Sequence, residues 1–455
     1  MQSAAQRAFH SSSIILNKMN PFKIGMIGGG TVGGGVYELI MDRLKSSTDT
    51  TRPMIISKIC VRDLHKPRDF HIDPSHTQLV SDINEVLDDD SIDLIVEVMG
   101  GTGLAKTVVL KALENKQHVV TANKALIAEH LSEIQSSLQQ NSSVKFGMEA
   151  AVCGGIPVIH VLQSVYTGDV IHEIMGICNG TTNYMLGKME EGADYDEVLK
   201  EAQNLGYAEA DPTADVEGHD VRAKIAILAK LAFGTSVTPV EDIPCQGISS
   251  VSSVDFEYAK LLNCTIKLVG TASRLSQYGE HDGPLTVYVT PKLVPMTHLL
   301  ASARGSGNAV AVTSANLGTN SYTGPGAGRF PTANSVVSDI CRINANTCTS
   351  SPFSSQISGS SSSIDIDNDY TSRFYVRISF RDSIGIIRII GELCEKNGIS
   401  IHSVLQNPIV DRMAADFVVT TESCKFSQVR SLTSDIELQE FSRGKPLCMP
   451  ILMED

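Results

Sequence analysis

The stretch that decides the fold is FKIGMIGGGTVGGGVYELIMDRL, residues 22–44. Its first part, Lys23–Ile27, is a short apolar run that predicts a buried strand, and the apolar residues after the glycines recur with helical spacing. Between the two segments, Gly28, Gly30 and Gly33 form a G-x-G-x-x-G pattern. A strand, a glycine turn and a helix in this order are the context in which this pattern binds a dinucleotide.

Each glycine of the pattern has a separate task. Gly28 permits the tight turn, Gly30 lets a pyrophosphate approach the backbone, and Gly33 lets the helix pack on the strand. The N-terminus of the helix offers N–H donors and a partial positive charge to the phosphates. A glycine-rich loop that binds nothing is the competing interpretation.

The end of the next predicted strand bears on the choice of cofactor. The strand is MIISKICV, residues 54–61, and Arg62 follows it directly, with Asp63 next and Lys66 close behind. An arginine here can hold the 2′-phosphate of NADP, whereas an acidic residue binds the ribose hydroxyl of NAD. We therefore expect NADP(H) as the preferred cofactor, with NAD(H) as the alternative through Asp63. The other interpretation of Arg62 is an ordinary solvated strand end.

Strands and helices continue to alternate along the first third of the chain. Apolar runs at Leu94–Val98, His118–Thr121 and within residues 142–157 predict further buried strands. This alternation indicates an α/β fold with a Rossmann-type, doubly wound parallel sheet. Ligands of such sheets lie beyond the carboxyl ends of the strands. The residues at these ends are Gly100, Asn123, Lys124 and Glu149.

A polar turn precedes another predicted helix in GICNGTTNYMLGKM, residues 176–189. The threonine hydroxyls and the N–H groups of the helix N-terminus can hold a substrate carboxylate. The alternative is that Thr182 or Asn183 simply caps the helix.

Carboxylates gather just before an apolar helix predicted over residues 219–233, in the segment NLGYAEADPTADVEGHDVRAKIAILAKLAFG (204–234). Asp220 and Lys224 are four residues apart and share one helix face. The loop before the helix adds Tyr207, Glu209, Asp211 and Asp215.

This carboxylate cluster has two interpretations. A surface salt bridge would contribute only about a few tenths of a kcal/mol. The helix is too apolar for a surface, however, and one lysine does not need four carboxylates. We therefore expect the cluster to face a cavity, where carboxylates bind a substrate ammonium. Lys224 would then protonate the alkoxide that hydride transfer to an aldehyde creates.

Composition excludes several classes of function. The formal net charge of −14 over 455 residues argues against a nucleic-acid partner, which needs a basic face. No stretch is apolar for long enough to span a bilayer, so no membrane partner is expected. The ten cysteines include no C-x-x-C pair, which indicates neither a disulfide framework nor a zinc site and fits a reducing compartment.

The first 19 residues have the composition of a transit peptide. MQSAAQRAFHSSSIILNKM is rich in serine, contains Arg7 and Lys18, and has no acidic residue. We expect a mitochondrial location from this segment. A cytoplasmic location follows if the segment is a short tail or if Met19 is the true start.

Six motifs together resemble the homoserine dehydrogenase family over roughly residues 22–350. They are GGGTVGGGV, VVTANKAL, EAAVCGGIP, NGTTNYML, GYAEADPTADVEGHDVRAKIAILA and GPGAGRFPTANSVVSDI, long and in order. The resemblance implies NAD(P)H-dependent reduction of L-aspartate 4-semialdehyde to L-homoserine. That reaction belongs to threonine, isoleucine and methionine biosynthesis. The resemblance also implies a homo-dimer or tetramer.

The resemblance assigns roles to individual residues. In the cofactor site it places the glycine turn with Thr31, Val32, Gly100, Lys124 and, from the later chain, Gly326. Lys224 is the catalytic acid/base with Asp220 beside it. Glu209 binds the substrate amino group, and Tyr207, Thr182 and Asp215 lie close.

The same resemblance implies a structural sodium ion in the loop EAAVCGG. Its ligands would be Glu149, Val152, Gly154 and Ile156. Three of these would bind through backbone carbonyls, which suits a hard cation.

The chain divides into an extension and three domains. Residues 1–19 are the extension, and 20–150 form the NAD(P)-binding domain, completed by about 324–348. Residues 151–323 form the catalytic, substrate-binding and dimerisation domain, in which 265–275 and 284–294 alternate like half-exposed strands. Residues 349–370 are Ser-rich and predict a flexible linker to a separate small domain.

That small domain, residues 371–455, has a β-α-β-β-α-β pattern and resembles the ferredoxin-like ACT amino-acid-sensing domain. The ACT family usually carries D-x-P-G at its first strand–helix turn, whereas this chain has DSIG (382–385). We expect threonine as an effector there, with an oligomerisation module as the alternative.

Two other functions stay open from the sequence. One is a related dehydrogenase that acts on a different small aldehyde or amino acid, although the carboxylates around Lys224 favour a substrate with an ammonium group. The other is a catalytically inactive cofactor or amino-acid sensor of the same architecture. The intact Glu209, Asp220 and Lys224 argue against it.

Overall fold

The computed structural model describes residues 20–46, 52–235, 237, 239–274, 284–348 and 365–452. The expected transit peptide lies outside these ranges. The chain forms two compact units, each with its own sheet. The first unit comprises Met1–Gly168, Ala226–Val240 and Gly324–Gly359, and the second comprises Asp169–Ile225, Glu241–Thr323 and Ser360–Asp455.

The first unit contains a six-stranded sheet in the order β3-β2-β1-β4-β5-β6, and every pair of neighbouring strands is parallel. This is the strand order of dinucleotide-binding folds, so the predicted Rossmann-type sheet is confirmed. The strands are β1 (Phe22–Ile27), β2 (Met54–Cys60), β3 (Gln78–Val80), β4 (Leu94–Glu97), β5 (His118–Thr121) and β6 (Phe146–Gly147).

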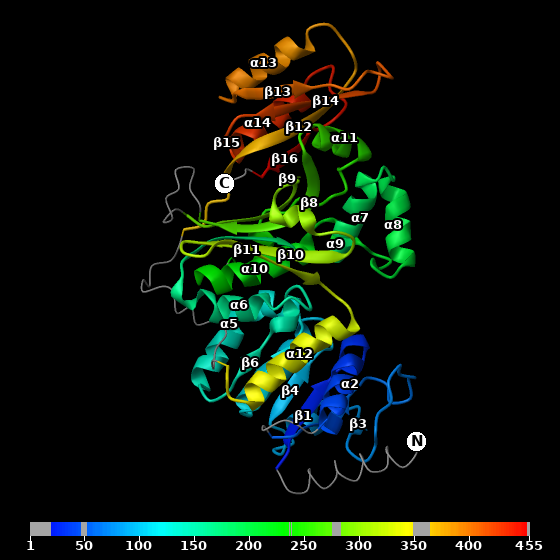
Figure 1. Ribbon diagram of the computed structural model, residues 1–455, viewed down its shortest axis with the longest axis vertical. Helices are drawn as coiled ribbons and strands as arrows, with labels where there is room; N and C mark the ends of the chain where they lie inside the picture. The colour runs from blue at the N-terminus through cyan, green and yellow to red at the C-terminus, as the bar shows by residue number, and fades with distance from the viewer. Residues whose placement is uncertain are drawn as a thin grey trace. The chain divides into compact units, whose positions relative to one another are not determined.

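The helices of this unit include one from much later in the chain. α12 (Arg329–Asn344) packs beside α2 (Thr31–Ser46), the helix that follows the glycine turn (Figure 1). The others are α3 (Asn84–Leu87), α4 (Gly103–Glu114), α5 (Lys124–Gln140) and α6 (Val158–Ser164), with short 3-10 turns at Glu149–Ala151 and Tyr166–Gly168.

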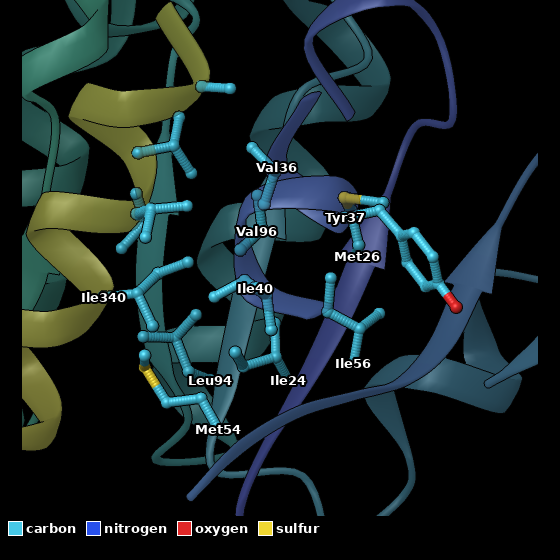
Figure 2. Packing of buried hydrophobic residues seen from close by; sticks show 14 of the residues in the cluster. Ile24, Met26, Val36, Tyr37, Ile40, Met54, Ile56, Leu94, Val96 and Ile340 are labelled. Carbon is cyan, nitrogen blue, oxygen red and sulfur yellow. The ribbon is translucent and has the colours of Figure 1, made fainter. Parts of the chain in front are cut away.

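A single apolar core holds α2 and α12 on the parallel sheet (Figure 2). Ile24 and Met26 from β1 are fully buried beneath Val36 and Ile40 from α2, and Ile340 of α12 joins the same cluster. Each such side chain contributes about 1.5–3 kcal/mol relative to an exposed one. The glycine turn between β1 and α2 is therefore fixed at both of its ends.

The second unit contains a ten-stranded sheet in the order β11-β10-β7-β8-β9-β16-β12-β14-β13, with β15 paired to β12. Its first half is built from β7 (Ile171–Ile177), β8 (Cys264–Ser273), β9 (Thr286–Pro295), β10 (Gly307–Ser314) and β11 (Gly318–Pro325). Its helices are α7 (Gly180–Glu190), α8 (Tyr195–Asn204), α9 (Thr213–Val216), α11 (Ser253–Leu261) and the part of α10 (His219–Phe233) up to Ile225, with short 3-10 turns at Val240–Asp242 and Leu299–Ser302.

The C-terminal part of this unit has the predicted β-α-β-β-α-β order with one extra two-residue strand, β15, before its second helix. The elements are β12 (Thr371–Phe380), α13 (Ile386–Lys396), β13 (Ile401–Leu405), β14 (Ala415–Thr421), β15 (Cys424–Lys425), α14 (Phe426–Glu437) and β16 (Leu447–Ile451). Both helices pack on one apolar cluster with the strands. Gly385 joins β12 to α13 in a left-handed conformation with φ +94°, which a residue with a Cβ adopts only with strain.

The expectation of a separate small domain behind a flexible linker differs from this structure. β16 pairs with β9 of the preceding domain, where the Leu452 N–H donates to the Leu293 carbonyl at 2.8 Å. Just before β12, the Leu285 N–H donates to the Asp365 carbonyl at 2.8 Å. The end of the predicted linker is therefore paired with the sheet, whereas residues 349–364 lie outside the described ranges.

The prediction that β8 and β9 are half-exposed is wrong, because both strands are buried on almost every residue. Two lysines of these strands are buried inside the protein and hydrogen-bonded there. Lys267 Nζ donates to Asn183 Oδ1 and to the Ala303 carbonyl, both at 2.9 Å. Lys292 Nζ donates to the hydroxyls of Thr271 and Tyr288 at 2.8 and 2.9 Å. Burial lowers the pKa of Lys267 to about 8.

A buried carboxylate joins α11 to the C-terminal sheet. Asp255 is fully buried and forms the capping box of α11 with Ser252. Its Oδ1 accepts hydrogen bonds from the Tyr375 hydroxyl and from Arg377 Nε, both at 2.7 Å. Burial, followed by the Asp255 charge, raises the pKa of Tyr375 above its usual range. The Arg377–Asp255 ion pair is largely shielded from solvent, with 15% of the Arg377 side chain and none of the Asp255 side chain exposed.

Replacing Arg377 with leucine should lower the free energy of unfolding by about 3 kcal/mol, because Asp255 would keep its buried charge without a cation. Urea denaturation measures this loss. Arg388→Leu is the control in the same domain, since Arg388 and Glu392 form an exposed i,i+4 pair. The free energy of unfolding of Arg388→Leu should fall by less than about 0.5 kcal/mol. Equal losses in the two variants would contradict the importance of burial.

Candidate functional site

The glycine turn of the first unit has the geometry that the motif predicts. Gly28 has φ +115°, and a Cβ there would lie 2.6 Å from the Val98 carbonyl oxygen. A Cβ at Gly33 would lie 2.4 Å from the carbonyl oxygen of Gly28, so α2 packs directly on the turn. A Cβ at Gly30 would meet nothing within 4 Å. The backbone at Gly30 is therefore open to an approaching phosphate.

Two residues of the expected cofactor site begin α2. Thr31 is exposed and Val32 is half-buried, so the first turn of the helix is open to a ligand. The N–H groups of this turn have no acceptor within the helix.

Arg62 is exposed and follows β2, whose last carbonyl accepts the Gly28 N–H at 3.0 Å. The loop that Arg62 begins therefore starts beside the glycine turn. Arg68 folds this loop back on itself, because its guanidinium donates to the carbonyls of Asp63 and Lys66 at 2.6 and 2.9 Å.

The ends of β4 and β5 hold the next two predicted residues. Gly100 is exposed with φ +77°, and Lys124 is the first residue of α5. A buried carboxylate that the sequence motifs do not predict lies at the end of β4. Glu97 is fully buried and accepts hydrogen bonds from the Thr121 hydroxyl at 2.6 Å and from the Met99 N–H at 2.9 Å. In the sequence, Glu97 is marked only by being the one acidic residue at the end of an otherwise apolar strand.

Asn123 extends this network between the two strand ends. It caps α5 by accepting the Leu126 N–H at 3.1 Å, and its amide donates to the Gly101 carbonyl at 2.6 Å. The turn that contains Gly100 is thereby tied to the start of the helix that carries Lys124.

Gly326 lies against the loop expected to hold a cation. A Cβ at Gly154, where φ is +50°, would lie 2.5 Å from the Gly326 carbonyl oxygen. The Gly155 N–H donates to the Pro325 carbonyl at 3.0 Å, and the Ser335 hydroxyl of α12 donates to the Gly154 carbonyl at 2.7 Å. The later chain therefore returns to the first unit at this loop.

Both carboxylate oxygens of Glu149 are occupied by the N-terminus of α6. They accept the N–H groups of Ile159 and His160 at 2.9 and 2.6 Å, and the Glu149 N–H itself donates to Asp339 Oδ2 at 2.8 Å. Burial, and then the nearby Asp339 charge, raises the pKa of Glu149 to about 8. The Glu149 side chain is therefore a helix cap.

The predicted charged pair lies in the second unit and is buried. Lys224 Nζ donates to Asp220 Oδ2 at 2.8 Å and to the Cys178 carbonyl at 2.5 Å. Both side chains are only about a tenth exposed, 11% for Lys224 and 9% for Asp220. Asp215 belongs to the same cluster through Asn179, whose amide donates to Asp215 Oδ1 at 2.6 Å and to Asp220 Oδ2 at 2.9 Å.

The loop before α9 is more exposed than this cluster. Tyr207 and Glu209 are both exposed, and the loop is fixed through its backbone. The Thr181 hydroxyl donates to the Tyr207 carbonyl at 2.6 Å, and Gln203 Nε2 donates to the Glu209 carbonyl at 3.1 Å. The backbone of the loop is therefore held by hydrogen bonds, while the Glu209 side chain is exposed.

The cap of α7 is Asn179, not Thr182 or Asn183. Asn179 Oδ1 accepts the Thr182 N–H at 2.8 Å and the Thr182 hydroxyl at 3.0 Å, so the buried Thr182 side chain is engaged in the cap. The N–H groups of Gly180 and Thr181, in the first turn, have no acceptor within the helix. The sequence signal for this cap is an asparagine just before the helix.

Comparison with known proteins matches this arrangement to one family. The family model for homoserine dehydrogenase matches residues 157–341, and the model for the homoserine dehydrogenase NAD binding domain matches residues 28–146. The homoserine dehydrogenase of Synechocystis sp. is 40% identical over 94% of this chain and 99% of its own length. That of Bacillus subtilis is 38% identical over 92% of this chain and 96% of its own length.

The chain belongs to the homoserine dehydrogenase family. A solved homoserine dehydrogenase from Thiobacillus denitrificans superposes with a TM-score of 0.85 at 33% identity, covering 95% of this chain and 98% of that one. A solved homoserine dehydrogenase from S. aureus superposes with a TM-score of 0.73 at 29% identity, covering 95% of this chain and 100% of that one. The family identified from the sequence motifs is thus confirmed, and with it a nicotinamide-dependent oxidoreductase.

The glycine turn gives a matched pair of variants. Gly30→Ala should weaken NADPH binding by about tenfold or more, because its Cβ occupies the approach to the backbone, and should leave the melting temperature unchanged. Gly33→Ala should lower both the NADPH affinity and the melting temperature, because its Cβ collides with the Gly28 carbonyl. Quenching or enhancement of NADPH fluorescence and a thermal melt measure the two effects. Native NADPH affinity in Gly30→Ala would contradict the cofactor assignment.

Proposed function

We propose that this homoserine dehydrogenase catalyses the reversible reduction of L-aspartate 4-semialdehyde to L-homoserine with NAD(P)H, in threonine, isoleucine and methionine biosynthesis. The observation that supports it most is the buried Lys224–Asp220 pair beside Asp215 and the N-terminus of α7. A substrate with an ammonium group, a carboxylate and an aldehyde matches these three kinds of partner. A reduced nicotinamide supplies the hydride.

The residues of the second unit would then divide the work. Asp215 and Glu209 bind the substrate ammonium, with Tyr207 and Thr182 close by, and the first-turn N–H groups of α7 receive its carboxylate. When the carbonyl carbon gains a hydride, its oxygen becomes an alkoxide. Lys224 donates a proton to that oxygen, and Asp220 stabilises the ammonium and fixes its direction.

Lys224→Ala should lower kcat/KM for aspartate semialdehyde by about a hundred- to ten-thousand-fold, which is the usual contribution of general acid–base catalysis. The loss of NADPH absorbance at 340 nm measures it. Lys230→Met on the same helix is the control and should keep native activity. Native protein without activity would favour an inactive sensor of the same architecture.

In the reverse direction Lys224 has to accept the proton, so homoserine oxidation should rise from neutral toward alkaline pH. A rate that stays flat over this range would contradict the role of Lys224 even if the reaction itself is confirmed.

We also propose that NADP(H) is preferred over NAD(H). The exposed Arg62 at the end of β2 supports this preference, and Lys66 adds positive charge to the same loop. Asp63 keeps NAD(H) as the alternative.

Arg62→Ala should lower kcat/KM with NADPH by about tenfold, the effect of one hydrogen bond to a charged group, and should leave the value with NADH unchanged. Steady-state assays with both cofactors measure this. An unchanged NADPH-to-NADH ratio would show that Arg62 does not contact the phosphate.

We propose that the loop at Glu149, Val152, Gly154 and Ile156 holds a structural Na⁺ or a similar monovalent cation. Because both Glu149 carboxylate oxygens already accept N–H groups of α6, Glu149 would contribute its backbone carbonyl as the other three residues do. Carbonyl oxygens are suitable ligands for a hard cation. The role would be structural, since hydride transfer needs no metal.

We propose that the C-terminal domain, residues 371–455, is an ACT domain that senses threonine, and that the protein is a homo-dimer or tetramer. Support comes from the sheet order β16-β12-β14-β13 and from the left-handed Gly385 at the strand–helix turn. An oligomerisation module without ligand remains the alternative for this domain.

Millimolar threonine should reduce the activity of the full-length enzyme, and Gly385→Val should remove that response while keeping basal activity, because valine is strained at φ +94°. Initial rates with and without threonine measure this. Activity unchanged by threonine in the native enzyme would favour the oligomerisation module.

The location proposed is mitochondrial or cytoplasmic, and it depends on residues 1–19, outside the described ranges. Within the described part of the chain, no helix combines the length and the hydropathy that crossing a bilayer requires.

A further inference from the structure

Asn179 occupies the centre of the charged cluster in the second unit. It is the last residue before α7 and is 5% exposed. Its Nδ2 donates to Asp215 Oδ1 at 2.6 Å and to Asp220 Oδ2 at 2.9 Å. A primary amide nitrogen has two hydrogens. Both are therefore used, one for each carboxylate.

The other end of the same amide fixes its orientation. Asn179 Oδ1 accepts the N–H and the hydroxyl of Thr182 at 2.8 and 3.0 Å. These two donors identify the oxygen, so the nitrogen has to face the carboxylates. The side chain is thus held by α7 and in turn holds residues of α9 and α10.

Asp220 Oδ2 accepts hydrogen bonds from two donors, Asn179 and Lys224. Movement of the amide would therefore move the acceptor that orients the Lys224 ammonium. The same ammonium also donates to the carbonyl of Cys178, the residue directly before Asn179. Two consecutive residues at the end of β7 thereby set the position of the proton donor.

We propose that Asn179 is a positioning residue of the reaction: it holds Asp215 and Asp220 in place and, through Asp220, aims Lys224. The proposal rests on the proposed function for the roles of these three groups. Asparagine suits the position because a neutral double donor can lie between two carboxylates. An acidic residue would repel both, and a hydroxyl could serve only one.

Two substitutions separate this role from capping. Serine and aspartate are both good N-caps, so Asn179→Ser and Asn179→Asp keep an acceptor for the Thr182 N–H and lose the two donors. Asp194→Ser at the cap of α8 is the control, since the Asp194 side chain caps that helix outside the cluster. Thermal melts should give similar stabilities for Asn179→Ser and Asp194→Ser, and a lower one for Asn179→Asp, whose new carboxylate faces two others.

The kinetic effect of the two substitutions should fall on catalysis. Both should lower kcat for aspartate semialdehyde by about ten- to a hundredfold, the size expected when a reacting group is displaced by about 1 Å. Asp194→Ser should keep native kcat and KM. Native kinetics in Asn179→Ser and Asn179→Asp would overturn the proposal and leave Asn179 as a cap only.

The pH profile supplies a readout that a structural role would not move. The charged groups beside Lys224 include Asp220 on α10 and, across the amide, Asp215 on α9. Asn179→Asp adds a third carboxylate, which favours the ammonium form of Lys224. The alkaline rise of homoserine oxidation should therefore move up by about one pH unit in this variant, but not in Asp194→Ser.

Acetylation of Lys224 by acetic anhydride gives the same information without any turnover. Its rate against pH, read by mass spectrometry of the Lys224 peptide, should show the upward shift in Asn179→Asp. If the native enzyme is inactive with aspartate semialdehyde, the proposed function fails while this labelling still tests Asn179. Identical labelling profiles for native protein and Asn179→Asp would overturn the positioning role.

Discussion

Burial of a lysine ammonium is unfavourable because it removes the charge from water. In the second unit, hydrogen-bond partners from two segments offset this cost at Lys224. Lys224 lies at the first turns of α10, a helix that packs so closely on β8 that a Cβ at Gly270 would lie 2.9 Å from Val221. Only charged or polar partners can stabilise an ammonium there. Asp220 comes from the same helix, and the Cys178 carbonyl comes from the end of β7. The end of β7 and the start of α10 therefore together stabilise the buried ammonium.

The segment between α9 and α10 is held to the sheet by a second, independent set of contacts. The Ile248 N–H donates to the Val216 carbonyl at 2.8 Å, and a Cβ at Gly247 would lie 2.2 Å from that same oxygen. One residue earlier, the Gln246 N–H donates to the Val289 carbonyl of β9 at 2.9 Å. The carboxylates at either end of this junction, Asp215 and Asp220, thus depend on contacts with the strands as well as with each other.

The sequence predicts the parts of the molecule that follow from local pattern. The strand–glycine–helix unit at Gly28–Gly33 and the pair Asp220–Lys224 depend on spacing within one segment, and periodicity reveals both. Asn179 and Glu97 were missed because their partners come from other segments, and a single amide or carboxylate has no periodic signal. The prediction for β8 and β9 is wrong because of Lys267 and Lys292. Alternating polar residues predict a solvated face, and the pattern does not show that buried hydroxyl and carbonyl groups accept hydrogen bonds from these lysines.

The pairing of β16 with β9 could not be read from local pattern either, since it joins residues more than 150 positions apart, Leu293 and Ile451. This pairing also matters in the absence of any ligand. Without β16, β9 would be an edge strand with unpaired N–H and C=O groups, the kind of surface that recruits other chains into aggregates. The C-terminal domain therefore protects the sheet of the catalytic domain from non-native strand pairing.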